Sequence, residues 1–122
     1  MANALYLIVG AALGASGRYA LAGWVSRAAG TPFPWGTLAV NLAGCLAVGL
    51  AWGLAERLLW APGFRVFLFV GVLGSFTTLS TFGLETVHLL RSAEYARALG
   101  YVLASNLGGL FLVWMGMGLT RG

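Results

Sequence analysis

Charged side chains are scarce in this sequence, which contains no lysine and no aspartate. Only 8% of its 122 residues are charged, while 60% are apolar. A soluble domain carries about a quarter charged residues, which are needed to cover its surface with polar groups. The shortage excludes a soluble globular domain, and we expect an integral membrane protein instead.

Cysteine and clustered positive charge are also lacking. Cys45 is the only cysteine, which excludes an intrachain disulfide, and its apolar neighbours favour a buried role. The seven arginines stand apart from one another. No basic cluster could follow a phosphate backbone, so we expect no nucleic-acid partner. The amino terminus lacks the basic region of a signal peptide, which predicts that the first apolar run is retained.

Four apolar stretches are each long enough to cross a bilayer as a helix, which needs about 20 residues. The strict alternation of a membrane β-barrel is absent, so the sequence predicts an all-α membrane protein with one domain over residues 1–122. The short connections hold prolines and glycines, leaving no room for a catalytic domain, and we expect no enzymatic activity. The predicted spans are 4–25, 36–55, 66–90 and 98–119.

The arginines at the span ends show no bias towards one side of the membrane, although such a bias normally sets orientation. Each side receives three, with Arg18 left out because it lies inside a span. The chain could therefore insert in both directions and pair as an antiparallel homodimer. Alternatively, translocation machinery or Arg18 decides one orientation. The two sets are Arg57, Arg65 and Arg121, and Arg27, Arg91 and Arg97.

Arg18 lies roughly 10 Å from the end of its span at the helical rise. Its side chain could snorkel to the interface as an anchor, or it could bond to a partner subunit. Small residues four positions apart predict close helix contacts at Gly10/Gly14 and Gly49/Gly53. Thr37 and Asn41 have the same spacing and should share one helix face.

The third span concentrates small and hydroxyl-bearing residues between Gly71 and Gly83. Glycine and threonine lower helix propensity, and hydroxyls compete for backbone groups, so we predict a break from Gly74 to Ser80. Free carbonyls there could bind a cation, and hydroxyls could donate to an anion. The alternative is an intact helix whose hydroxyls bond to their own carbonyls. Beyond it, Glu85 suits either a pore mouth or packing, while His88 suits an interface.

Motifs on all four spans, in order, resemble the small fluoride channels called Fluc or CrcB proteins. The third-span motif is the specific one. The matching segments are Gly17-Arg18-Tyr19, Gly36-Thr37-Leu-Ala-Val-Asn41-Leu-Ala-Gly44, Gly71-Val-Leu-Gly74-Ser-Phe-Thr77-Thr78-Leu79-Ser80-Thr81-Phe82-Gly-Leu-Glu85, and Tyr101-xxx-Ser105.

The resemblance implies a dual-topology homodimer in the cytoplasmic (inner) membrane, with two pores that pass fluoride passively and relieve its toxicity. Backbone carbonyls of Gly74 and Thr77 from both subunits would hold a structural sodium ion at the dimer centre, and Arg18 would have a structural role. Membrane lipid would surround the dimer. The residues implied for the fluoride path are Asn41, Phe82, Thr37, Ser80, Thr81, Tyr101 and Ser105.

Two positions depart from the family pattern. Leu79 stands where a second phenylalanine is usual, so one ring edge per pore is missing. Gly109 stands where a serine is often found, which shortens the hydroxyl track of the fourth span. Two other classes remain open. A proton-coupled multidrug exporter needs a deep carboxylate, for which Glu85 is the only candidate; a non-transporting assembly subunit would leave the third span without a purpose.

Overall fold

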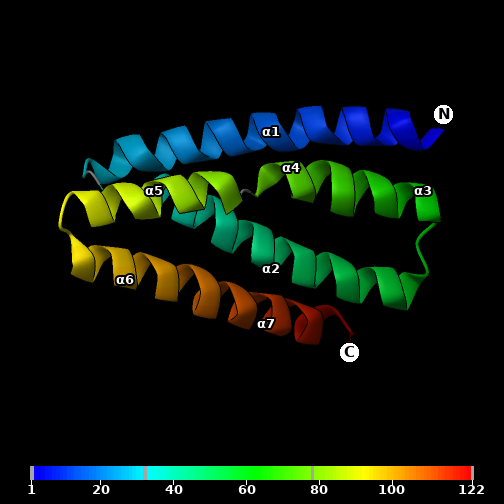
Figure 1. Cartoon of the computed structure of the whole chain (residues 1–122). Helices are drawn as coiled ribbons and strands as arrows, with labels where there is room; N and C mark the ends of the chain where they lie inside the picture. Colours follow the sequence, from blue (N-terminus) through cyan, green and yellow to red (C-terminus); the bar gives the residue numbers. More distant parts are fainter. Residues whose placement is uncertain (1, 32, 78, 122) are drawn as a thin grey trace.

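The chain is a bundle of antiparallel helices. The computed structural model describes residues 2–31, 33–77 and 79–121, and no strand occurs within those ranges. Both termini and the connection between the second and third spans lie at one end of the bundle (Figure 1). Four units are long and apolar enough to cross a membrane, which confirms an all-helical multi-pass membrane protein: Asn3–Ala29, Trp35–Leu58, Pro62–Arg91 and Tyr95–Thr120.

The first two spans are single helices, whereas the last two are composite. Two segments, η1 and η2, are π-helical, with the wider i→i+5 turn that often marks functional sites. The first and second spans are α1 (Ala2–Ala29) and α2 (Trp35–Leu58). The third contains α3 (Pro62–Arg65), η1 (Val66–Leu73), α4 (Gly74–Phe76) and α5 (Leu79–Arg91), and the fourth contains α6 (Tyr95–Leu103), η2 (Ala104–Gly108) and α7 (Gly109–Arg121).

Glycines bring neighbouring helix backbones into direct contact. A Cβ added at Gly10 would lie 2.7 Å from the carbonyl oxygen of Phe67, and one at Gly14 would collide with the carbonyl of Val72. These contacts hold α1 against η1, as the Gly10/Gly14 spacing predicts. Between α2 and α7, a Cβ on Gly49 would likewise collide with a backbone carbonyl. The first contact fixes α1 against the third span, and the second fixes α2 against the fourth span.

The third span is interrupted at Thr77, whose ψ of 157° is extended. The interruption is shorter than the predicted stretch from Gly74 to Ser80, because Gly74 keeps helical dihedrals (φ −63°, ψ −34°) and Ser80 already belongs to α5. Thr78 lies outside the described residues. The two halves follow one another in nearly the same direction, so the span bends only slightly (Figure 1).

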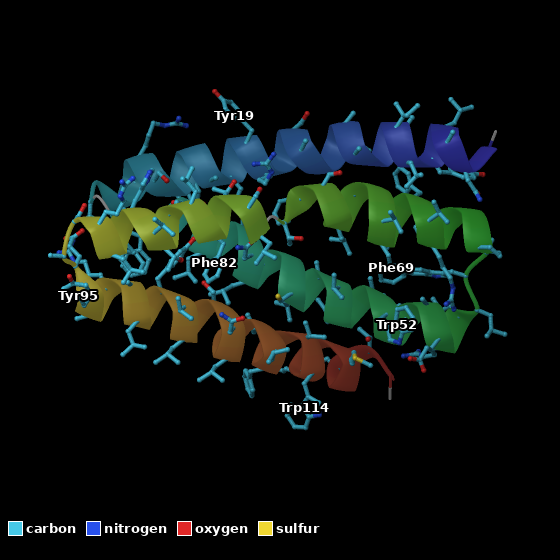
Figure 2. All side chains as sticks on the ribbon, viewed as in Figure 1. Tyr19, Trp52, Phe69, Phe82, Tyr95 and Trp114 are labelled. Carbon is cyan, nitrogen blue, oxygen red and sulfur yellow. The ribbon has the colours of Figure 1, made fainter. Side chains whose placement is uncertain are left out.

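Few side chains are buried within a single chain. A cluster of Leu38, Leu89, Ala98 and Tyr101 forms the core at the end of the bundle away from the termini, and α2 is the most buried span. Large side chains such as Tyr19 and Trp114 point outward (Figure 2). Outward-pointing apolar side chains are expected where lipid tails, rather than water, surround the helices.

Candidate functional site

A cavity of about 460 Å³ lies beside the interruption, between α2, α4, α5 and η2. Among the predicted path residues, Asn41, Phe82 and Ser105 line it, together with Gly74 and Thr77. No charged side chain from the described part of the chain contributes to its lining. We call it the central cavity. Its other lining residues are Gly44, Cys45, Val48, Leu79, Asn106 and Val113.

A second cavity, of about 360 Å³, lies between α1, α2 and α5 and contains Arg18, Thr37 and Thr81. We call it the arginine cavity, because Arg27 lines it as well. Thr37 therefore lies in a different cavity from Asn41, although the two are one turn apart. Four residues of an α-helix rotate by about 40° more than a full turn, which is enough to separate them. Ser80 lies at the exposed start of α5, outside the linings of both cavities.

Tyr101 is fully buried and stands next to the Phe82 ring. The two ring centroids are 5.0 Å apart, and the Phe33 ring meets Tyr101 edge-on at 5.6 Å. The hydroxyls of Tyr101 and Ser105 are buried, and neither has a hydrogen-bond partner in the described part of the chain. Buried hydroxyls normally have partners, so these two are available for a ligand or water.

Glu85 accepts a hydrogen bond from the Thr37 hydroxyl, with 2.5 Å between the oxygens. Thr37 is buried and Glu85 is partly buried, and a low local dielectric strengthens a charge-assisted bond of this kind. Glu85 also lines a third cavity, of about 230 Å³, with His88 and Glu94 at the end of the bundle. The sequence alone left Glu85 open between a pore mouth and packing. The structure shows its bond to Thr37 on α2 and its place in the lining of the third cavity.

Arg18 reaches the interrupted segment within its own chain. Its Nε donates to the carbonyl oxygen of Ser75 at 3.2 Å. The sequence suggested an interfacial anchor or a contact with a partner subunit, and this intrachain bond is a third role. At the interruption itself, the backbone N–H and hydroxyl of Thr77 both donate to the Leu73 carbonyl, at 3.2 and 3.1 Å. These bonds hold the end of α4 in place and explain why the helix continues past Gly74.

Backbone oxygens at the end of α4 suit a hard cation better than side chains do. The last carbonyls of a helix lack partners within that helix, and hard cations take oxygen ligands. A Cβ added at Gly74 would meet only the Phe69 carbonyl, at 3.5 Å, so the backbone there is open to close approach. The described residues hold no cluster of three or more histidine, cysteine or acidic side chains that could bind a metal. The carbonyls of Gly74 and Thr77 therefore fit the predicted ion.

Asn106 and Cys45 line the central cavity but were not predicted for it. For Asn106 a signal exists in the sequence, since a carboxamide at membrane depth is costly and marks a packing contact or a pathway. Its position directly after Ser105 places it on another face of a regular α-helix, which hides that signal. Cys45 carries no comparable signal, because a small apolar residue in an apolar run has no distinguishing feature.

Known proteins align with the chain over almost its full length. A family model described as CrcB-like protein, Camphor Resistance (CrcB), matches residues 5–117. The chain is 46% identical to the fluoride-specific ion channel FluC of Hahella chejuensis, over 96% of this chain and 93% of the relative. It is 44% identical to that of Chloroflexus aurantiacus, over 99% and 97%. It is 47% identical to FluC 1 of Moorella thermoacetica, over 96% and 84%. The chain therefore belongs to the CrcB-like family.

Proposed function

We propose that the protein is a fluoride-selective channel that lets fluoride leave the cell passively across the cytoplasmic (inner) membrane and so relieves its toxicity. Relatives that carry the name fluoride-specific ion channel match nearly the whole chain. The observation that carries the proposal is the central cavity, where an amide, an aromatic ring and a buried hydroxyl meet without a charged side chain. These groups belong to Asn41, Phe82 and Ser105.

The chemistry of these groups suits fluoride. The ion is strongly hydrated, so a selective path must replace its water with several donors at once. Fixed positive charges would hold the ion, whereas neutral donors in series let it leave again. The amide of Asn41 and the hydroxyl of Ser105 are such donors. The edge of the Phe82 ring carries the positive part of the aromatic quadrupole and can face an anion.

The path extends beyond the central cavity along hydroxyls. Tyr101 supports this extension, since its hydroxyl is buried without a partner in the described residues and its ring packs on Phe82. Thr37 and Thr81 line the arginine cavity on the other side of α2, and Ser80 stands at the start of α5. We assign all four to the polar track, with Glu85 at its mouth.

A sodium ion sits at the centre of the assembly, held by backbone carbonyls of Gly74 and Thr77 from two copies of the chain. The extended backbone of Thr77 and the open space around Gly74 support this arrangement. A buried cation would raise the local electrostatic potential and favour an anion nearby without lying in its path. Arg18 supports the site by fixing the Ser75 carbonyl.

The two copies pair in antiparallel orientation and form two pores. The even arginine count allows either orientation of insertion. The interrupted segment of one chain is exposed, with 80% of Leu79 accessible, so a partner could cover it. The pairing would place both sets of α4 carbonyls at the same depth in the membrane.

The direct test is fluoride efflux from liposomes that contain the purified protein, with chloride efflux as the reference. We expect fluoride to leave and chloride to stay. Asn41→Leu should slow fluoride by about tenfold or more, because a hydrogen bond to an ion contributes roughly 1.5–3 kcal/mol. Phe82→Leu should slow it by about two- to tenfold, because it removes the ring edge. Phe111→Leu is the matched control, since that ring is 55% exposed and lines none of the cavities described above.

Selectivity, the path through the central cavity and dual insertion each have a result that would refute them. Wild-type liposomes that release chloride as fast as fluoride would refute selectivity. If Asn41→Leu and Phe82→Leu both release fluoride at the wild-type rate, the central cavity is not the path. A carboxyl-terminal tag found on one side only, in a protease-protection assay on cells, would refute dual insertion.

A further inference from the structure

Asn106 is a polar side chain at the middle of the fourth span. It lies 11 residues beyond Tyr95, where that span begins, or roughly 16 Å along a helix. A carboxamide at this depth is costly unless it faces protein or a polar path. Its side chain is exposed in the single chain and borders the central cavity. The amide has one hydrogen bond within the chain, to Val102, and capacity for a further partner.

Asn106 lines the central cavity from the π-helical segment η2, directly after Ser105. Successive residues of an α-helix point about 100° apart, and two neighbours on α2, Gly44 and Cys45, also line this cavity. The cavity is therefore wide enough to receive side chains from adjacent positions. The wider turn of a π-helix places fewer degrees between successive residues. Ser105 and Asn106 thus bring two polar side chains to the η2 wall of the cavity.

The amide of Asn106 is held in place with donor capacity to spare. Its Nδ2 donates to the Val102 carbonyl at 2.8 Å. A carboxamide nitrogen carries two hydrogens, so one N–H remains for another acceptor. The bond to Val102 limits rotation of the side chain, which reduces the entropy lost when that N–H meets an ion. An amide so fixed resembles the donor that we assign to Asn41 on α2.

Gly109, one turn beyond Ser105, carries no donor, and Cys45 packs against it. A Cβ added at Gly109 would lie 3.0 Å from the Cys45 Sγ, so a serine there would require Cys45 to shift slightly. Among the described residues of the fourth span that line the central cavity, the side chains able to form hydrogen bonds are those of Ser105 and Asn106.

We infer that Asn106 is a fluoride-contacting residue that helps to determine selectivity, donating from η2 into the central cavity that Asn41 lines from α2. This inference rests on the proposed channel function. Fluoride in the cavity then meets amides from two walls as well as the Ser105 hydroxyl. Three neutral donors replace more of the hydration shell than two, and a larger, less hydrated halide gains less from them.

The test compares fluoride efflux of the wild type with Asn106→Leu, which keeps the side-chain volume and removes the amide, and with Asn106→Ala. Both should slow fluoride by about tenfold or more, given the usual strength of a hydrogen bond to an ion. Leu107→Ala is the control, because Leu107 is 63% exposed, lies in the same π-helical segment and does not line the cavity. It should conduct like the wild type.

A rescue distinguishes a donor from a packing residue. Adding Gly109→Ser and Cys45→Ala to Asn106→Leu restores a hydroxyl to this wall, because the Cβ of residue 45 lies an ordinary 3.9 Å from the new side chain. We expect fluoride efflux to recover in part. No recovery, with slow fluoride in the single variants and a weakened assembly on gel filtration, would overturn the donor role in favour of helix packing.

The remaining outcomes keep the inference and the proposed function apart. If the wild type conducts fluoride and both Asn106 variants stay within about twofold of it, a difference of less than 0.5 kcal/mol in barrier, only the role of Asn106 is overturned. If the wild type itself does not conduct fluoride, the proposed function fails first and the inference falls with it.

Discussion

Replacing Gly14 by alanine tests whether backbone contact between α1 and η1 holds the interrupted span in place. An added Cβ would collide with the carbonyl oxygen of Val72 and lie 3.1 Å from the Phe76 nitrogen. Both are backbone atoms, which cannot rotate aside as the end of a side chain can. The two helices must therefore separate locally if residue 14 is alanine.

The expected cost follows from two opposing terms. Forcing an extra methyl into a tightly packed contact costs about 1–3 kcal/mol. Alanine regains up to about 1 kcal/mol, since it forms helix more readily than glycine. We expect Gly14→Ala to lower the free energy of unfolding by about 1–2 kcal/mol. Equilibrium unfolding in mixed detergent micelles, followed by circular dichroism, measures this quantity.

Gly100→Ala is the matched control, because a Cβ at Gly100 meets nothing within 4 Å. It should be neutral or stabilise by up to about 1 kcal/mol. Gly14 also lies one turn before Arg18, which bonds to Ser75, so Gly14→Ala should slow fluoride efflux as well. Equal unfolding free energies for the two alanine variants would refute the contact and the reasoning built on it.

Two further predictions concern single side chains of the site. Thr37→Val should lower the free energy of unfolding by about 1–3 kcal/mol, because the partly buried Glu85 carboxylate loses its donor; Thr37→Ser should retain wild-type stability in the same detergent assay, and a destabilised serine variant would contradict this. Leu79→Phe should raise fluoride efflux from liposomes by about two- to tenfold, since it adds a ring edge at the central cavity where Leu79 is 80% exposed. Unchanged or slower efflux would show that a second ring is not limiting.

Much of the fold follows from properties that act locally along the chain. The four spans are long apolar segments, and bilayer thickness alone requires each to be helical. The glycines at positions 10 and 14 share one face, so their contact with another helix is foreseeable from spacing. The density of small and hydroxyl-bearing residues before Thr81 also predicts an interruption in the third span, and Thr77 is extended.

The extent of the interruption depends partly on a contact that no local pattern contains. Gly74 has low helix propensity, yet it stays helical and belongs to α4. The Arg18 guanidinium fixes the Ser75 carbonyl from 57 positions away, while Thr77 forms a local bond back to Leu73. Together these bonds override propensity, which is a weak preference of about 1 kcal/mol at most for glycine.

The lining of the central cavity was only partly predictable from the sequence. Asn41, Phe82 and Ser105 come from three different helical elements, and a motif on each span suffices to suggest them. Asn106 was not predicted because periodicity assigns adjacent residues to different helix faces, whereas the central cavity receives adjacent residues from both η2 and α2. No sequence pattern in residues 104–108 predicts a π-helix. Only the packed structure shows which residues of the fourth span face the cavity: Ser105, Asn106 and Val113 line it, whereas Gly109 packs against the Cys45 thiol.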